Sequence, residues 1–346
     1  MALLEVDDLK VSFKTDDGVV QAVRGVSFEV DRGKTLGIVG ESGSGKSVST
    51  QTLTGLTRGA QVSGQARFDG VDLLTASDKQ LRAIRGVRIG MIFQDPLTSL
   101  HPAYSVGWQI VEMIRSHKKD VSKKAAKERA VELLGLVGIP KPRQRVDDYP
   151  HQFSGGMRQR VMIAMAMALN PDLLIADEPT TALDVTVQAQ VLDVMRRLQE
   201  EFGTAIVLIT HDLGVVAEMA DDVVVMYAGR VAERASRRDT FYANHHPYTE
   251  GLLASLPRRD SVGERLLPIK GAPPSLINLP AGCPFAPRCP YAFARCHEET
   301  PELTEVFRTP GHDSACFLPG HREEREQLRT ELRASLLASH ENEGVA

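Results

Sequence analysis

The chain has 346 residues, 42% of them hydrophobic, and a formal net charge of −4. This length and apolar content predict one large buried core with a smaller appendage, and the charge gives no support to a nucleic-acid partner held by overall positive charge. The longest apolar run, residues 161–169, is far shorter than the roughly 20 residues that cross a bilayer. The first residues turn acidic at once, unlike a signal peptide. We therefore expect a cytosolic protein that reaches a membrane only through partners.

A phosphate-binding loop is predicted near the N-terminus. Residues 3–30 and 61–70 alternate in polarity, as in an antiparallel sheet. Between them, a short apolar run at 35–39 leads into GESGSGKS at 40–47, which fills every position of the GxxxxGK[ST] pattern. Its glycines allow successive N–H groups to face one anion, and apolar helix-compatible residues follow. A plain Gly/Ser turn would not need all of these features. The candidate phosphate-binding residues are Gly40, Glu41, Ser42, Gly43, Ser44, Gly45, Lys46, Ser47 and Val48.

Lys46 is expected to reach the β- and γ-phosphates of a nucleotide, and the Ser47 hydroxyl is expected to coordinate Mg²⁺. A second anion-binding helix start is predicted further on, at FSGGMRQR over residues 153–160. Ser154 is a suitable N-cap, and residues 161–169 read as a buried helix. Because the first site is already complete, the second site makes sense if two subunits face each other and share their nucleotides.

Three more apolar runs, at 172–176, 204–209 and 223–226, are continuous rather than alternating, which favours buried strands of a mainly parallel sheet. Asp177 and Glu178 follow the first of these runs. In that place Asp177 suits the Mg²⁺ shell, through water, and Glu178 suits the general base that activates the attacking water. The alternative is an acidic helix cap before Pro179, which the upstream phosphate loop makes the weaker interpretation.

All four cysteines, Cys283, Cys289, Cys296 and Cys316, lie in one short segment after a Pro- and Gly-rich stretch at 256–282. Four unrelated thiols would rarely gather so closely, although buried or incidental thiols remain the simplest alternative. Disulfides are disfavoured in a reducing cytosol. Zinc sites usually contain a closer Cys pair than this spacing provides, whereas a Cys₄ iron–sulfur cluster tolerates varied loop lengths. Either group would staple a segment that is poor in apolar residues.

Taken in order, these motifs resemble those of the ATP-binding cassette transporter ATPases. Ser154, Gly155 and Gly156 match the signature, and Gln94 matches the Q-loop glutamine that senses Mg²⁺ and the water. The D-loop TALD ends at Asp184. His211 corresponds to the switch histidine at the γ-phosphate, and Phe13 is the aromatic expected to stack on adenine. The resemblance implies an α/β fold: a P-loop NTPase cassette with a RecA-like core, an antiparallel β subdomain and a helical subdomain at about 95–156.

The amino-acid sequences at 40–47, 93–102, 153–160 and 177–188 closely resemble those of oligopeptide/dipeptide importer ATPases. In that family methionine is the usual residue after the signature glycines, as Met157 is here. The expected organisation is a nucleotide-binding domain at 1–255, a C-terminal region of that family at 256–320, and a charged helical or disordered tail at 321–346. The resemblance also ranks a [4Fe–4S] cluster first for the cysteines, before zinc or no metal.

As a member of that family, the chain is expected to hydrolyse ATP with Mg²⁺ at a dimer interface and so drive uptake of di- or oligopeptides. Its implied partners are a second, non-identical ATPase, two membrane permease subunits that dock after Gln94 (residues 95–108), and an extracytoplasmic solute-binding protein. The implied location is peripheral, at the cytoplasmic face of the cell membrane. Nickel or a sugar is the alternative cargo.

Three other classes of protein share part of this pattern. A P-loop kinase would need neither Ser154 nor Asp184, and DNA-repair or chromosome ATPases separate their motifs with coiled coils or zinc insertions that are absent between Ser47 and Ser154. A regulatory subunit without catalytic activity would not need Glu178 and His211, which are both present.

Overall fold

The computed structural model describes residues 2–95, 99–181, 183–256, 269–306 and 309–318, together with Gln327. The tail predicted at 321–346 lies outside the described residues except for Gln327. Residues 257–268 of the Pro- and Gly-rich stretch also lie outside them. Among the helices of the described residues, none is long and apolar enough to cross a membrane.

The centre of the fold is an eight-stranded sheet in the order β11-β12-β10-β9-β3-β8-β7-β6. The five strands from β9 to the edge strand β6 are parallel. Every residue of β3, β7 and β8 is buried, so the continuous apolar runs are strands covered on both faces, as predicted. The parallel strands are β3 (Thr35–Val39), β6 (Ile89–Ile92), β7 (Leu173–Asp177), β8 (Ala205–Thr210) and β9 (Asp222–Tyr227).

A second, antiparallel sheet has the order β2-β1-β4-β5 and confirms the expectation from residues 3–30 and 61–70. Its strands are β1 (Leu4–Thr15), β2 (Gly18–Val30), β4 (Gln61–Phe68) and β5 (Val71–Asp72). The alternating pattern of β1 places Leu4, Val6 and Val11 in a core shared with one face of the large sheet.

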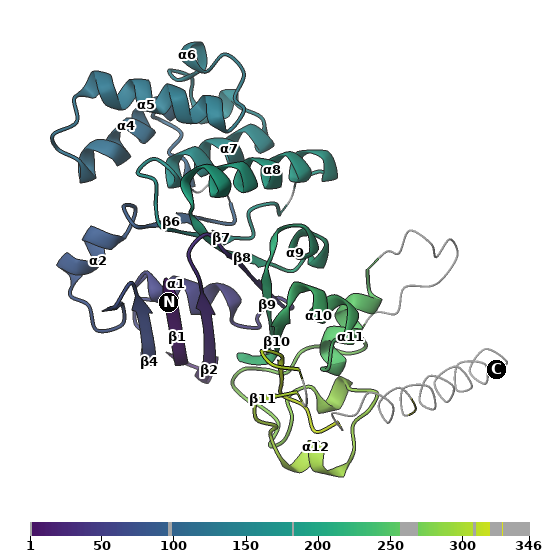
Figure 1. Ribbon diagram of the computed structural model, residues 1–346. Helices are drawn as coiled ribbons and strands as arrows, with labels where there is room; N and C mark the ends of the chain where they lie inside the picture. The colour runs from purple at the N-terminus through teal and green to yellow at the C-terminus, as the bar shows by residue number, and fades with distance from the viewer. Residues whose placement is uncertain are drawn as a thin grey trace.

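Helices cover the other face of the large sheet (Figure 1). There α4 (Val106–His117), α5 (Lys123–Leu136), α7 (Gly155–Ala166) and α8 (Val185–Phe202) share one core with β6, β7 and β8. Helix α7 begins at Gly155 with Ser154 as its N-cap, as predicted, and it ends at Ala166, before the end of the apolar run at 161–169. The remaining helices are α1 (Lys46–Leu53), α2 (Asp78–Ile84), α6 (Pro142–Arg145), α9 (Leu213–Met219), α10 (Arg237–Tyr242), α11 (Pro247–Ala254) and α12 (Ala294–Glu298), with 3₁₀ turns η1 (Pro150–Gln152) and η2 (Ala286–Arg288).

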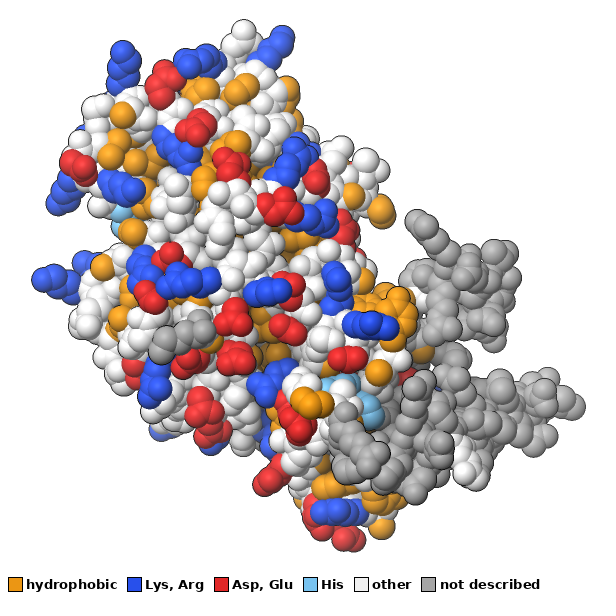
Figure 2. All heavy atoms as spheres, in the orientation of Figure 1, with side chains coloured by type: hydrophobic (Ala, Val, Ile, Leu, Met, Phe, Trp, Pro, Cys, Tyr) orange, Lys and Arg blue, Asp and Glu red, His pale blue; other side chains and the backbone are white. Residues whose placement is uncertain are grey.

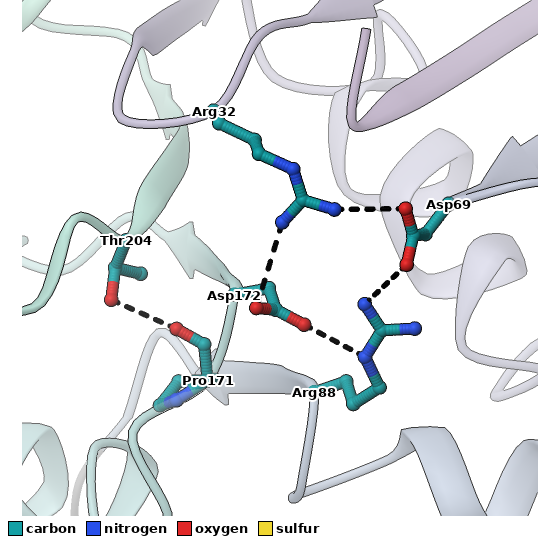
Figure 3. Close-up of polar contacts among 6 residues, drawn as sticks. All are labelled: Arg32, Asp69, Arg88, Pro171, Asp172 and Thr204. Atoms are coloured by element: carbon teal, nitrogen blue, oxygen red, sulfur yellow. Dashed lines mark hydrogen bonds and ion pairs between the residues drawn. The ribbon is translucent and has the colours of Figure 1, made fainter.

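A ring of ion pairs joins the antiparallel sheet to the large sheet (Figure 3). Arg32 contacts Asp69 at 2.8 Å and Asp172 at 3.7 Å, and Arg88 contacts the same two carboxylates at 2.7 Å each. Hydrogen bonding from the Arg88 guanidinium holds the pKa of Asp69 below its usual range. A single exposed ion pair adds little to the stability of a fold. Here the four side chains come from four separate segments next to strands, and the ring of pairs holds these segments in one arrangement.

The C-terminal segment joins the large sheet directly. β10 (Arg230–Ser236) forms a hairpin with β9. β12 (Asp313–Ser314) pairs with β10, and β11 (Thr304–Glu305) pairs with β12. In Figure 1 this segment lies against the β10 edge of the sheet, beside α11. On the face seen in Figure 2, basic and acidic side chains are interspersed, in keeping with the nearly balanced charge of the chain.

Candidate active site

The phosphate loop connects β3 to α1, and two of its glycines are required by close approach of the backbone. A Cβ atom at Gly40 would lie 2.2 Å from the carbonyl oxygen of Met226, and one at Gly45 would lie 2.3 Å from the carbonyl oxygen of Ala22. Both residues also have positive φ angles, 151° and 97°. The path of the loop therefore excludes any side chain at these two positions.

Lys46 lies across this loop with its side chain buried. Its Nζ donates hydrogen bonds to the carbonyl oxygens of Gly40 at 2.6 Å and Glu41 at 2.9 Å. Burial lowers the pKa of Lys46, and the carboxylates of Glu178, Asp177 and Glu41 oppose that shift. The Ser44 hydroxyl is buried and has no hydrogen-bond partner among the described residues. A buried lysine and an unsatisfied donor at the start of α1 fit an anionic phosphate group.

Ser47 and Asp177 lie together, as the predicted Mg²⁺ site requires. The Ser47 hydroxyl donates to Asp177 Oδ1 at 2.7 Å, and Gln51 Nε2 lies 3.4 Å from the other carboxylate oxygen. Burial raises the pKa of Asp177, while its hydrogen bonds from Ser47 and Gln51 act in the opposite direction. A hydroxyl and a carboxylate fit Mg²⁺, which takes few protein oxygens and completes its shell with phosphates and water. Sequence reasoning missed Gln51, although it lies four residues after Ser47 on α1.

Glu178 is the point at which the other predicted catalytic residues meet. Its Oε2 accepts hydrogen bonds from Gln94 Nε2 at 2.9 Å and from the Thr181 hydroxyl at 2.8 Å, and its Oε1 lies 3.4 Å from His211 Nδ1. Gln94 follows β6 and His211 follows β8, so strands on both sides of β7 contribute. The φ angle of Glu178 is +49°, a strained conformation for a residue with a side chain and one that clusters at functional sites.

The signature residues lie on the helical face, apart from the phosphate loop. The Ser154 hydroxyl caps α7 by accepting from the Met157 N–H at 3.4 Å, and Asp184 caps α8 by accepting from the Val187 N–H at 3.0 Å. A Cβ atom at Gly156 would lie 2.2 Å from Val187 Cγ1, so the starts of α7 and α8 are packed together. A Cβ atom at Gly155 would have no described atom within 4 Å, so the start of α7 is open at this position. In the described part of the chain, no hydrogen bond joins these residues to the phosphate loop, and α1 covers the opposite face of the sheet (Figure 1).

Phe13 lies in β1 opposite Val20 of β2, partly buried against the core of the antiparallel sheet. The register of the two strands shifts between Val11 and Ser12, just before this position. β1 and β2 both contact α1, so Phe13 belongs to the sheet that borders the phosphate-binding helix.

The four cysteines line one small cavity, although they come from separate turns of the chain. None forms a disulfide, and burial raises the pKa of Cys289 and Cys316 to about 12. Within the described ranges, no three His, Cys, Asp or Glu side chains are grouped to hold a metal ion. That arrangement supports neither an iron–sulfur cluster nor zinc at these cysteines.

Comparison with known proteins divides the chain into two matched regions. Residues 23–181 match the family model described as ABC transporter, and residues 232–296 match that described as Oligopeptide/dipeptide transporter, C-terminal region. The chain is 53% identical over 329 residues to the dipeptide transport ATP-binding protein DppD of Bacillus subtilis, covering 94% of this chain and 97% of that one. It is 53% identical over 318 residues to the oligopeptide transport ATP-binding protein OppD of Salmonella typhimurium, covering 92% and 94%.

Solved structures support the same assignment. One is the dimeric, post-hydrolysis ATP-binding cassette MJ0796 bound to ADP and Pi, with a TM-score of 0.62 and 27% identity, covering 68% of this chain and 99% of that one. The nucleotide-binding fold is thus shared with a cassette that forms a dimer, and the region beyond it is shared with peptide-transport proteins. The chain belongs to the ATP-binding cassette ATPases of the oligopeptide/dipeptide transporter family.

Proposed function

We propose that this chain hydrolyses ATP to drive uptake of di- or oligopeptides through membrane permease subunits. The observation that carries the catalytic part is the convergence of Gln94, Thr181 and His211 on the Glu178 carboxylate. The peptide cargo is supported by the names of the relatives, which are dipeptide and oligopeptide transport proteins, and by the matching C-terminal region.

Each nucleotide contact has a candidate residue. Lys46 and the N–H groups of the loop bind the phosphates, Ser47 and Asp177 hold Mg²⁺, and Phe13 stacks on adenine. Glu178 takes a proton from the attacking water, while Gln94 and His211 orient that water and the γ-phosphate. Mg²⁺ supplies charge neutralisation between the phosphates when it is bound.

The Ser154, Gly155 and Gly156 group acts on ATP held by a second subunit, with Asp184 at the same interface. Its separation from Lys46 on the opposite face of the sheet supports this trans arrangement, as does the dimeric state of the related cassette. The partner is a non-identical ATPase of the same type.

Membrane attachment comes from partners at the cytoplasmic face: two permease subunits, supplied by an extracytoplasmic solute-binding protein. We place their docking surface on residues 95–108, of which 96–98 lie outside the described residues. Support comes from Tyr104 and Trp108, whose rings stack at 4.0 Å while remaining 43% and 42% exposed. Large exposed aromatic rings are common at protein interfaces. Residues 1–255 then form the nucleotide-binding domain and 256–320 the family's C-terminal region.

The cavity lined by Cys283, Cys289, Cys296 and Cys316 is the proposed site of a [4Fe–4S] cluster with a structural role. Burial raises the pKa of Cys283, Cys289 and Cys316, so a metal would have to displace protons from these thiols. Anaerobic purification should give brown protein with matching amounts of iron and acid-labile sulfide. A colourless, metal-free and fully folded protein would exclude the cluster.

The function is tested by reconstituting the chain with its permease subunits, partner ATPase and receptor in proteoliposomes. Peptide uptake should require ATP on whichever side of the vesicle membrane carries the ATPases. The Glu178→Gln substitution should abolish uptake. Uptake of nickel or a sugar in place of peptides would overturn the proposed cargo, and ATP-independent uptake would overturn the proposed role of the chain.

A further inference from the structure

The C-terminal part of the chain holds the second residue of the phosphate loop at two points. The Arg288 guanidinium contacts both carboxylate oxygens of Glu41, at 2.6 and 2.9 Å. The N–H of Glu41 donates to the Tyr248 hydroxyl at 2.9 Å. A residue that lies beside Gly40 is therefore fixed in both its side chain and its backbone by residues more than 200 positions away.

Arg288 is itself held firmly in place. Its side chain is only 5% exposed, its Nε donates to the carbonyl oxygen of Lys270 at 3.0 Å, and its Nη1 lies 3.2 Å from the Tyr227 hydroxyl. It ends the η2 turn that begins beside Phe285, whose ring packs against Tyr227 and Tyr248. A buried guanidinium with these fixed contacts is a preorganised partner for one carboxylate.

The charge on Glu41 bears directly on phosphate binding. Lys46 donates to the carbonyl oxygen of Glu41, and the Glu41 carboxylate is one of the charges that Lys46 senses. A bare carboxylate this close to a polyanionic nucleotide would repel it, and the low dielectric of a partly buried site would strengthen that repulsion. Arg288 neutralises this charge and holds it in a fixed position.

We propose that Arg288 is a positioning residue for ATP: it neutralises Glu41 and keeps the phosphate loop in its binding shape, which makes the C-terminal region a working part of the nucleotide site. This inference rests on the ATP site proposed above and adds a role for a segment that lies outside the cassette motifs. Tyr248, on α11, supports the same loop residue from its backbone.

The test is titration of the full chain with a fluorescent ATP analogue. Arg288→Met should weaken binding by about tenfold or more, because it leaves a carboxylate without its partner beside the phosphates. The KM for ATP should rise in the same proportion, while kcat at saturating ATP changes little. Arg143→Met is the matched control, since Arg143 forms an exposed two-point pair with Glu128 on the helical face, and it should bind as the wild type does.

A second substitution separates charge from structure. Adding Glu41→Gln to Arg288→Met removes the unneutralised carboxylate and should restore most of the lost affinity, and it should also restore folding if Arg288→Met alone does not fold. A double variant that binds as weakly as Arg288→Met, or that stays unfolded, overturns the proposal, as does wild-type affinity in Arg288→Met. If the wild-type chain itself does not bind ATP, the proposed function fails instead.

Discussion

Glu178→Gln should stop ATP turnover while leaving ATP binding intact. The amide has the size and shape of the carboxylate, so the donors Gln94 and Thr181 can still reach an oxygen at 2.8 to 2.9 Å. The φ angle of +49° costs the same for either side chain, and the stability of the fold should change little. What is lost is the proton acceptor. Removing a general base commonly lowers the rate by about a hundredfold or more, equivalent to roughly 2.7 kcal/mol of transition-state stabilisation.

ATP affinity should stay the same or rise, because Glu178 contributes a negative charge that Lys46 senses. The assays are phosphate release under saturating ATP, titration with a fluorescent analogue, and light scattering to detect the closed dimer that unhydrolysed ATP should trap. Glu218→Gln is the matched control, because it removes an exposed carboxylate of α9 that pairs with Arg196 of α8. Turnover of Glu178→Gln within a fewfold of the wild-type rate would refute the assigned mechanism.

Three further variants distinguish binding from catalysis. Lys46→Ala should weaken ATP binding by roughly 1.5–3 kcal/mol, the value of a charge-assisted contact, as measured by titration; unchanged affinity would contradict its role. His211→Ala should spare binding and slow phosphate release, since it lies at Glu178 rather than in the loop, and a loss of affinity without a loss of rate would oppose this. Ser154→Arg should bind ATP normally but inactivate the opposite site when mixed with wild-type subunits; loss of binding in the variant chain itself would refute the trans arrangement.

Much of the nucleotide site could be predicted because its signals are local. Continuous runs such as the one containing Ile175 leave little alternative to a buried strand, and the glycine pattern of the loop follows from backbone approaches like that of Gly45 to Ala22. The meeting of Gln94, His211 and Glu178 also follows once their strands are parallel neighbours, because the carboxyl ends of such strands share one edge.

The contacts that could not be predicted are those between distant segments. Glu41 and Arg288 are 247 positions apart, and the sequence around either residue does not predict that the two form an ion pair. β11 and β12 are two residues each, too short for any periodicity to reveal. The start of α2 is different, because Ser77 and Gln80 form a full capping box, a pattern that the sequence itself carries.

A buried carboxylate on β10 ties the C-terminal segment to the support of the phosphate loop. Glu233 is fully buried, and its oxygens lie 2.7 Å from His312 Nε2 and 3.1 Å from the N–H of His246, with the N–H of His245 also donating. A buried carboxylate is costly unless such partners are all present. His312 immediately precedes β12, while His246 caps the helix that carries Tyr248. Undocking the C-terminal segment would therefore remove a partner from Glu233 and Arg288 from Glu41 in one step, so the loop that binds phosphate and the segment that carries the cysteines are energetically linked.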